Sequence, residues 1–227
     1  EWILPTTGVI PALSVILKAL TEPGDKVILQ TPVYNCFFAV LERTGRQPLA
    51  NPLINENGAY RMDFEDLERK AADPQAKLIF LCNPHNPGGR VWSPEELRRV
   101  AEICTANGTL VVSDEIHADL TLPGRRHTVF ATVSEQARMN SVTYMAPSKT
   151  FNLAGLIGSY HIVYDPWWRD RIKKESSLCH YNSMNVLSMH ALIGAYRPEG
   201  YEWADELCET LTGNVDFACD YIAKHFE

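Results

Sequence analysis

The chain has 227 residues, of which 45% are hydrophobic and 22% charged, so it can bury a substantial core as one large globular domain with the beginning of a second. Its formal net charge is -7, and Lys and Arg are dispersed among acidic residues, which argues against binding to nucleic acids or acidic membrane surfaces and favours small-molecule chemistry. No apolar run approaches the roughly 20 residues that a membrane-spanning helix needs.

The six cysteines are widely spaced, with no C-x-x-C pair and no histidines beside them. In a chain of this size that spacing argues against both a disulfide framework and a zinc site. We therefore expect reduced thiols, no bound metal and a cytoplasmic location.

The first expected element is an apolar helix that begins near Pro11 and follows the segment Thr6-Thr7-Gly8-Val9. A glycine and free backbone amides at a helix N-terminus form an anion site that suits a phosphate group. The segment matches neither of the common glycine-rich phosphate-binding patterns, so a well-capped helix without a ligand is an equally good interpretation.

Short apolar runs then alternate with helical patterns. Strands are expected at 27–30, 78–82, 109–113, 141–145 and 157–163. A helix is expected from Pro94 to Ala106, after Ser93 as a cap, and a long amphipathic helix from Tyr201 to Phe226. Strands that are apolar throughout and separated by helices indicate a mostly parallel sheet with helices on both faces.

In such sheets ligands bind beyond the carboxyl ends of the strands. Four of these ends carry polar clusters, namely Thr31-Pro32-Val33-Tyr34, Asn83-Pro84-His85-Asn86-Pro87-Gly88-Gly89, Asp114-Glu115-Ile116-His117 and Ser148-Lys149. The functional site is expected where they meet.

Lys149 lies in a small polar turn, Ala146 to Gly155, directly after an apolar strand. A partly desolvated lysine amine forms a Schiff base with an aldehyde such as that of pyridoxal phosphate, whereas a solvated ammonium group does not. Most lysines are surface charges, and this segment alone does not decide between the two interpretations.

Asp114 and Asn86 each have a structural interpretation beside the cofactor-binding one. Asp114 is positioned for a carboxylate that keeps the cofactor's pyridine nitrogen protonated, but Ser-Asp-Glu after a strand is also common in turns. Asn86 could direct its amide at the cofactor's phenolic oxygen, or it could simply form a turn with its neighbouring prolines.

Tyr34 and His117 are the remaining candidates. The Tyr34 ring could stack on a flat heteroaromatic cofactor, but at least one of Tyr34, Phe37 and Phe38 must belong to the core. His117 could reach the phenolic oxygen or support Asp114, although a single histidine is more often a structural group.

Together these motifs resemble the fold-type I pyridoxal-phosphate enzymes of the class I/II aminotransferase superfamily, and within it the MalY/PatB-type cystathionine β-lyases, or C–S lyases. The resemblance covers essentially the whole chain and is carried by Thr31–Tyr34, Asn83–Trp92, Ser113–Asp119, Arg126–Thr128 and Pro147–Gly155. It implies a three-layer α/β/α fold with a mostly parallel mixed sheet. Residues 1–196 would be the cofactor-binding large domain, and 197–227 a long helix leading to a small domain.

The resemblance also implies the role of each candidate. Lys149 would bind pyridoxal 5'-phosphate covalently and remove the Cα proton, Asp114 would pair with the pyridine nitrogen, Asn86 and His117 would lie near the phenolic oxygen, and Tyr34 would stack on the ring. Gly8, Val9 and Ser148 would hold the phosphate. The chain departs from the superfamily pattern at Ala146, where a serine is common, and at Ile157 and Gly158, where an arginine is usual.

The expected activity is α,β-elimination from L-cysteine S-conjugates, with an amino-acid substrate and a homodimeric enzyme. Two alternatives stay open. One is an aminotransferase, since the same lysine and cofactor serve both reactions, and the other is a regulatory protein that keeps the fold. By the resemblance, an N-terminal segment and most of a C-terminal domain, which supplies the arginine for the substrate carboxylate, lie outside these residues.

Overall fold

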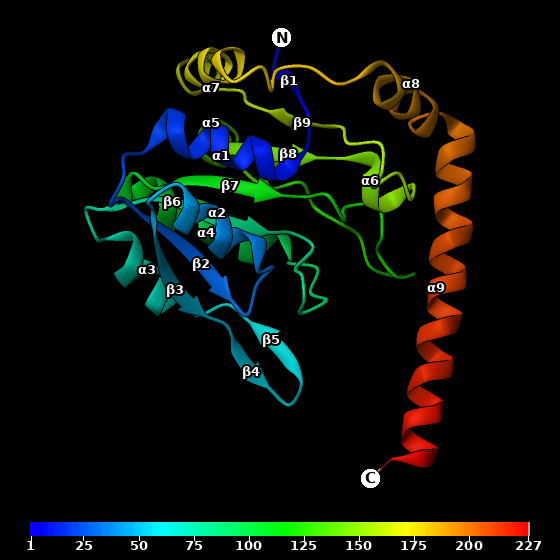
Figure 1. Cartoon of the computed structure of the whole chain (residues 1–227). Coiled ribbons are helices and arrows are strands. Elements are labelled where there is room, and N and C mark those ends of the chain that lie inside the picture. The colour runs from blue at the N-terminus through cyan, green and yellow to red at the C-terminus, as the bar shows by residue number, and fades with distance from the viewer. Residues whose placement is uncertain (227) are drawn as a thin grey trace.

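A computed structural model describes residues 1–226 and contains, within them, a seven-stranded sheet between two layers of helices (Figure 1). Its strands are β1 (Ile3–Thr6), β2 (Lys26–Thr31), β3 (Gln47–Pro52), β6 (Ala76–Cys82), β7 (Leu110–Asp114), β8 (Ser141–Met145) and β9 (Ser159–Ile162). Their order across the sheet is β1-β9-β8-β7-β6-β2-β3. The strands from β3 to β8 are parallel, whereas β9 runs antiparallel to both β8 and β1.

Helices cover both faces of this sheet (Figure 1). The first face packs on α1 (Val9–Leu20), α2 (Cys36–Arg43) and α7 (Pro166–Leu178), and the second on α3 (Phe64–Ala71), α4 (Pro94–Asn107) and α5 (Glu135–Met139). The remaining elements are the short helix α6 (Pro147–Thr150), α8 (Val186–Ala195), α9 (Pro198–His225), a 3-10 turn (Phe130–Thr132) and the hairpin β4 (Ile54–Glu56) and β5 (Ala59–Arg61). The predicted three-layer α/β/α fold with a mixed, mostly parallel sheet is confirmed.

The core divides into two clusters because successive strand residues point to opposite faces of the sheet. In β2, Val27 and Leu29 are buried against α1 and α2, while Ile28 between them is buried against the other helical layer. Each of these side chains is fully buried, which contributes about 1.5–3 kcal/mol per residue to stability. Burial on both faces explains why the central strands are mostly apolar.

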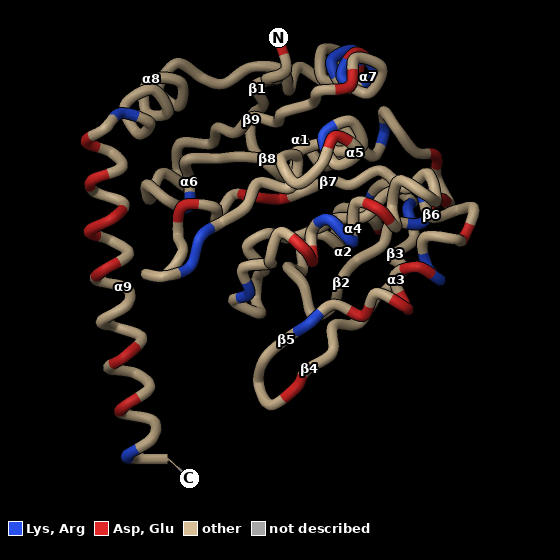
Figure 2. The backbone as a smooth tube through the Cα atoms, turned by 180° about the vertical axis from the view of Figure 1, so that it is seen from behind, with Lys and Arg blue, Asp and Glu red and all other residues tan. Residues whose placement is uncertain are grey.

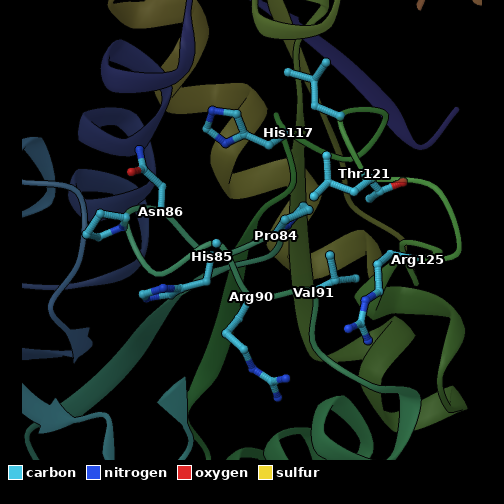
Figure 3. Close-up of a pocket in the computed structure, with 12 residues that line it drawn as sticks. Pro84, His85, Asn86, Arg90, Val91, His117, Thr121 and Arg125 are labelled. Carbon is cyan, nitrogen blue, oxygen red and sulfur yellow. The ribbon is translucent and has the colours of Figure 1, made fainter. Parts of the chain in front are cut away.

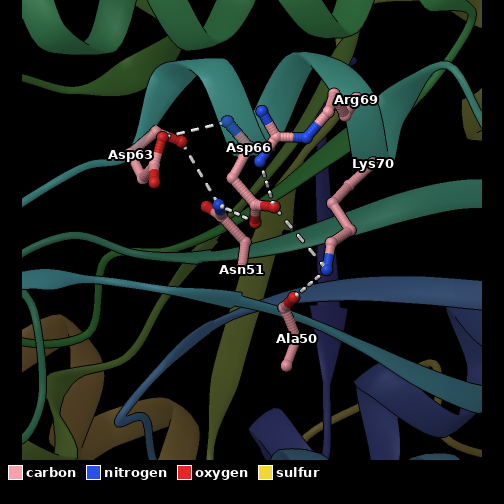
Figure 4. A network of polar contacts seen from close by, with 6 residues as sticks. All are labelled: Ala50, Asn51, Asp63, Asp66, Arg69 and Lys70. Atoms are coloured by element: carbon pink, nitrogen blue, oxygen red, sulfur yellow. Dashed lines mark hydrogen bonds and ion pairs between the residues drawn. The ribbon is translucent and has the colours of Figure 1, made fainter.

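Polar side chains fix the helix ends on the second face. Ser93 and Glu96 form a reciprocal capping box at the start of α4. At α3, the carboxylate of Asp63 accepts a hydrogen bond from the backbone N–H of Asp66 at 2.9 Å. Asp66 in turn accepts from Asn51 Nδ2 of β3 at 2.8 Å, so the cap also joins helix to strand (Figure 4).

The last helix runs beside the layers and then away from them (Figure 1). It spans Pro198–His225, so the predicted amphipathic helix from Tyr201 begins three residues earlier than expected. Among its described residues only Ala204 is buried. Acidic residues recur along α9, and Lys and Arg are scattered over the other elements (Figure 2). None of the described helices is both long and apolar enough to cross a bilayer.

Candidate active site

The carboxyl ends of the parallel strands lie at one edge of the sheet, where they bring the predicted residues together. Cys82 at the end of β6 pairs with Asp114 at the end of β7, and Asp114 pairs with Tyr144 of β8. A cavity of about 270 Å³ opens at this edge. Its walls include all eight predicted site residues: Gly8, Val9, Tyr34, Asn86, Asp114, His117, Ser148 and Lys149.

Asp114 lines the cavity and has only 5% of its surface exposed. Burial raises the pKa of its carboxyl to about 6, and the neighbouring Glu115 charge adds to this rise. A hydrogen bond from the backbone N–H of Ile116, at 3.3 Å, and the Lys149 charge act in the opposite direction. The position therefore suits a carboxylate that is ionised when a cation lies beside it.

Lys149 comes from α6, which begins immediately after β8, and it lines the same cavity. Its side chain is exposed in this structure, so the protein alone does not desolvate the amine. The reason is that the cavity is open above the strand ends and no described acidic group forms an ion pair with Lys149. Any desolvation of this amine has to come from a group that enters the cavity.

Asn86 lies in a turn that is closed by backbone hydrogen bonds. The backbone N–H of His85 donates to Arg90 O at 2.7 Å, and that of Gly89 donates to His85 O at 2.8 Å. The Asn86 N–H donates to Cys82 Sγ at 3.3 Å, which ties the turn to the end of β6. These bonds fix the backbone of Asn86, which lines the cavity.

His117 follows β7 and lies at the wall of the same cavity. Burial, together with the positive charge of Lys149, lowers the pKa of its imidazole. The ring is therefore neutral at neutral pH and can donate one hydrogen bond and accept another.

The start of α1 forms another part of the cavity wall. Gly8 is the N-cap residue with φ of 138°, a conformation essentially restricted to glycine, and a Cβ there would lie 2.8 Å from Ile157 Cγ2. The helix N-terminus has no side-chain cap, so the backbone N–H groups of Val9 and Ile10 are free to bind an anion, whereas Pro11 has none. Ala146 and Gly158 also line the cavity, so the two departures from the superfamily pattern lie at this site.

Tyr34 lines the cavity and is 39% exposed, while Phe37, its edge-to-face neighbour at 5.9 Å between ring centroids, is fully buried. Phe37 is therefore the core aromatic that the sequence required, and Tyr34 is available to a ligand. The Tyr34 ring packs against the buried core, because Phe37 packs in turn on Phe80 with 5.3 Å between ring centroids.

The cavity is also lined by residues to which no site role was assigned from the sequence, among them Cys82 and Ile116. Both flank Asp114, Cys82 across the strand pair and Ile116 along the chain. Burial, and then the nearby Asp114 charge, raises the pKa of the Cys82 thiol to about 12, so it stays protonated and unreactive. The register between strands, which would have revealed Cys82, is not visible in sequence alone.

A second, larger cavity of about 500 Å³ adjoins the first and shares Asn86 and His117 with it (Figure 3). It lies between the turn that carries Asn86 and the loop after β7, which contributes Thr121 and Arg125. The sequence did not predict this cavity, because its other wall comes from the loop after His117, whose course cannot be read from the sequence. In residues 1–226 no group of three or more His, Cys, Asp or Glu side chains is placed to hold a metal ion.

Comparison with known proteins places this geometry in a family. The model of the family "Aminotransferase class I and II" matches residues 1–217. Cystathionine beta-lyase PatB of Bacillus subtilis is 45% identical over 98% of the chain and 57% of its own length. Protein MalY of Escherichia coli is 32% identical over 96% of the chain and 55% of its own length.

A solved structure gives the same result. Cystalysin from Treponema denticola, whose crystal structure contains a pyridoxal 5'-phosphate cofactor, superimposes with a TM-score of 0.95 at 36% identity, covering 98% of the chain and 56% of cystalysin. The chain thus spans little more than half the length of these relatives. With the family model matching nearly its whole length, the chain belongs to the class I and II aminotransferase family.

Proposed function

We propose that this chain binds pyridoxal 5'-phosphate and that the full-length protein is a C–S lyase, which releases pyruvate, ammonia and a thiol from L-cysteine S-conjugates such as cystathionine. The observation that carries the proposal is the meeting of Lys149 and Asp114, from separate strand ends, in one cavity. The similarity to PatB, a cystathionine beta-lyase, and to PLP-containing cystalysin supports the choice of cofactor and reaction.

The residues present fit this cofactor at both of its ends. Asp114 offers a buried carboxylate, the kind of group that stabilises a protonated pyridine nitrogen. Gly8 leaves room that a Cβ would fill, beside the free amides of α1, which suits a phosphate. The Ser148 hydroxyl, at the same cavity wall, is a further donor.

When bound, the cofactor supplies an aldehyde for an amine and a ring that withdraws electrons from the substrate's Cα. Lys149 is the one lysine at the cavity, so we assign to its amine the covalent attachment and, once released, acceptance of the Cα proton. Asp114 would hold positive charge on the ring nitrogen, and Tyr34 would confine the ring from one side. Asn86 and His117 would donate to the phenolic oxygen.

The overall reaction balances with water as the only co-reactant. The Cα–H and Cβ–S bonds break, the thiolate takes up a proton, and water releases the remaining three carbons as pyruvate with loss of ammonia. For cystathionine the thiol is homocysteine. The protonated Lys149 ammonium left by Cα deprotonation is an acid at this cavity, so we assign to it the return of that proton to the departing sulfur.

Transamination is the second candidate, because the matching family model is that of aminotransferases and the same lysine would serve it. Purified full-length protein loaded with the cofactor should release pyruvate from L-cystathionine without any keto acid. Lys149→Ala should lower that rate by at least about 10³-fold, within the range lost when an activated catalytic group is removed. Amino-group exchange that requires a keto acid, without pyruvate release, would reject the lyase in favour of the aminotransferase.

Three further features of the protein belong to this proposal. We assign residues 1–196 to the cofactor-binding large domain and 197–227 to the helix that leads to a small domain. The full-length enzyme is proposed to be a homodimer with an amino-acid substrate. A cytoplasmic location is supported by the six cysteines, all of which are free thiols.

A further inference from the structure

Glu115, directly after Asp114, has its whole side chain buried and fully hydrogen-bonded. Its Oε2 lies 2.7 Å from His127 Nε2. Its Oε1 accepts a bond from Ser113 Oγ at 2.8 Å and one from the backbone N–H of Phe130 at 2.9 Å. The side chains of Glu115 and His127 are 0% and 8% exposed, so the contact is shielded from water.

A buried carboxylate destabilises a protein unless donors surround it, and a partner that is removed leaves the charge uncompensated. Glu115 does not line the cofactor cavity, and neither does His127. The pair therefore has no direct contact with the proposed chemistry, although it adjoins two residues that do, Asp114 on one side and His117 two positions on.

The pair closes the base of a loop. Residues 118–126 form the loop between His117 and His127, and this loop contributes one wall of the second cavity. Asn83 Nδ2 reinforces the closure by donating to Thr128 O at 3.0 Å. The same Asn83 donates its backbone N–H to Asp114 O at 2.9 Å, so both ends of the loop are tied to β6.

Backbone hydrogen bonds carry this constraint into the site. Glu115 N–H donates to Tyr144 O of β8 at 3.0 Å, and Ala118 N–H donates to Glu115 O at 3.0 Å. With its side chain held by His127 and its backbone by β8, Glu115 has little freedom to rotate. Asp114 and His117 are the neighbours whose positions depend on it.

We infer that Glu115 and His127 are positioning residues that fix the segment Asp114–His117 at the cofactor site. The inference rests on the proposed cofactor, but the geometric link stands in the cofactor-free protein and can be tested there. It predicts two separable effects. His127 affects the position of the segment Asp114–His117, and the charge of Glu115 affects the ionisation of Asp114.

The charge effect concerns Asp114. The groups whose charges act on it or face it are Glu115, Cys82 of β6, Tyr144 of β8, Lys149 of α6, Tyr34 and His117. Of these only Glu115 is a second carboxylate. Glu115→Gln removes that charge with nearly the same shape, so the cofactor should stay bound to a lower pH than in the wild type.

The geometric effect is tested with His127→Phe and its conservative partner His127→Gln in the full-length protein. Gln keeps an N–H donor for Glu115, whereas Phe keeps the ring volume and removes the donor. We expect His127→Phe to weaken cofactor binding, measured by absorbance titration, by about tenfold. This is the lower end of the loss in affinity seen when a residue that orients a ligand-binding side chain is removed. His127→Gln should stay within about threefold of the wild type.

Ser93→Ala is the matched control for destabilisation alone, because it removes the cap of α4 at a residue that lines neither cavity. Hydrogen–deuterium exchange of residues 114–118 in the cofactor-free protein supplies a second readout. Exchange there should be faster in His127→Phe than in His127→Gln or Ser93→Ala.

The outcomes separate the two proposals. Equal exchange in all three variants, or equal cofactor affinity in His127→Phe and Ser93→Ala, would show that the pair only stabilises the fold. If the wild-type protein binds no pyridoxal 5'-phosphate, the proposed function fails, and the exchange data alone then decide whether Glu115 and His127 hold the segment.

Discussion

At the scale of single residues, Asp114 is a buried carboxylate that does not stabilise the fold at neutral pH. Its carboxyl is buried, and its pKa is raised from 3.8 to about 6. The protonated form is therefore favoured in the folded state, and the stability that this contributes is present below about pH 4 and lost as pH rises through about 6. At neutral pH the ionised carboxylate opposes folding unless a cation binds beside it.

Asp114→Asn should for this reason stabilise the cofactor-free protein. A change of one unit in the pKa of a group corresponds to about 1.4 kcal/mol. The free energy of unfolding should therefore rise by roughly 1–3 kcal/mol near pH 8, with little change near pH 4. Asn can still accept the bond from Ile116 N–H. Urea unfolding at the two pH values checks this.

A variant that is less stable than the wild type at both pH values would contradict the burial argument. Cofactor affinity should move in the other direction, because the neutral amide cannot stabilise a protonated pyridine nitrogen. Stability gained and affinity lost in one substitution is the expected signature of a functional carboxylate.

The candidate site could be assembled from the sequence at this scale because its residues follow predicted strands. Asn86, Asp114 and Lys149 each lie at or just after the carboxyl end of a strand, and parallel strands end at one edge. The exposure of Lys149 and the contact between Glu115 and His127 could not be predicted, since the first depends on how open the cavity is and the second on how a loop folds back.

At the scale of elements, the start of α1 combines a strained backbone with a close contact. Gly8→Ala would place a Cβ 2.8 Å from Ile157 Cγ2 on a residue with φ of 138°. We expect a loss of about 1–3 kcal/mol in the free energy of unfolding, together with weaker binding of the cofactor. Chemical denaturation and an absorbance titration measure the two effects.

Adding Ile157→Ala to Gly8→Ala separates strain from contact. The double variant relieves the contact with Ile157 but keeps the unfavourable φ, so only part of the lost stability should return. Full wild-type stability in Gly8→Ala alone would show that the turn tolerates a side chain and that glycine is not required there.

The elements that the sequence analysis predicted are those with the strongest burial. The central strands β2, β6, β7 and β8 coincide with predicted apolar runs to within two residues at each end. The edge strands β1 and β3 were not predicted, because an edge strand is exposed and needs no apolar run, and β3 contains two prolines. For α9 the helical spacing was sufficient, since its period is independent of what it packs against.

At the scale of the whole molecule, apolar side chains lie exposed on the helices that follow the sheet. Those of α8 include Val186, Leu187, Met189 and Ile193. Exposed apolar groups gathered on one helix mark contact surfaces. If they belong to the proposed homodimer, Leu187→Glu in the full-length protein should weaken self-association by at least about tenfold, the cost of one buried charge at an interface.

Sedimentation velocity over a range of concentrations measures this equilibrium. Lys174→Glu, an exposed charge change on α7, is the control and should sediment like the wild type. A wild-type protein that stays monomeric at every concentration, or a Leu187→Glu variant that dimerises equally well, would contradict the prediction.

The proposal as a whole depends on one covalent bond, between Lys149 and the aldehyde of pyridoxal 5'-phosphate. Reduction of the cofactor-loaded full-length protein with borohydride makes this bond permanent, and peptide mapping by mass spectrometry then locates it. We predict a single phosphopyridoxyl group on the peptide that contains Pro147-Ser148-Lys149, and none there in Lys149→Ala. A stoichiometric label on any other lysine, with Lys149 unmodified, would contradict the assignment of this cavity as the cofactor site.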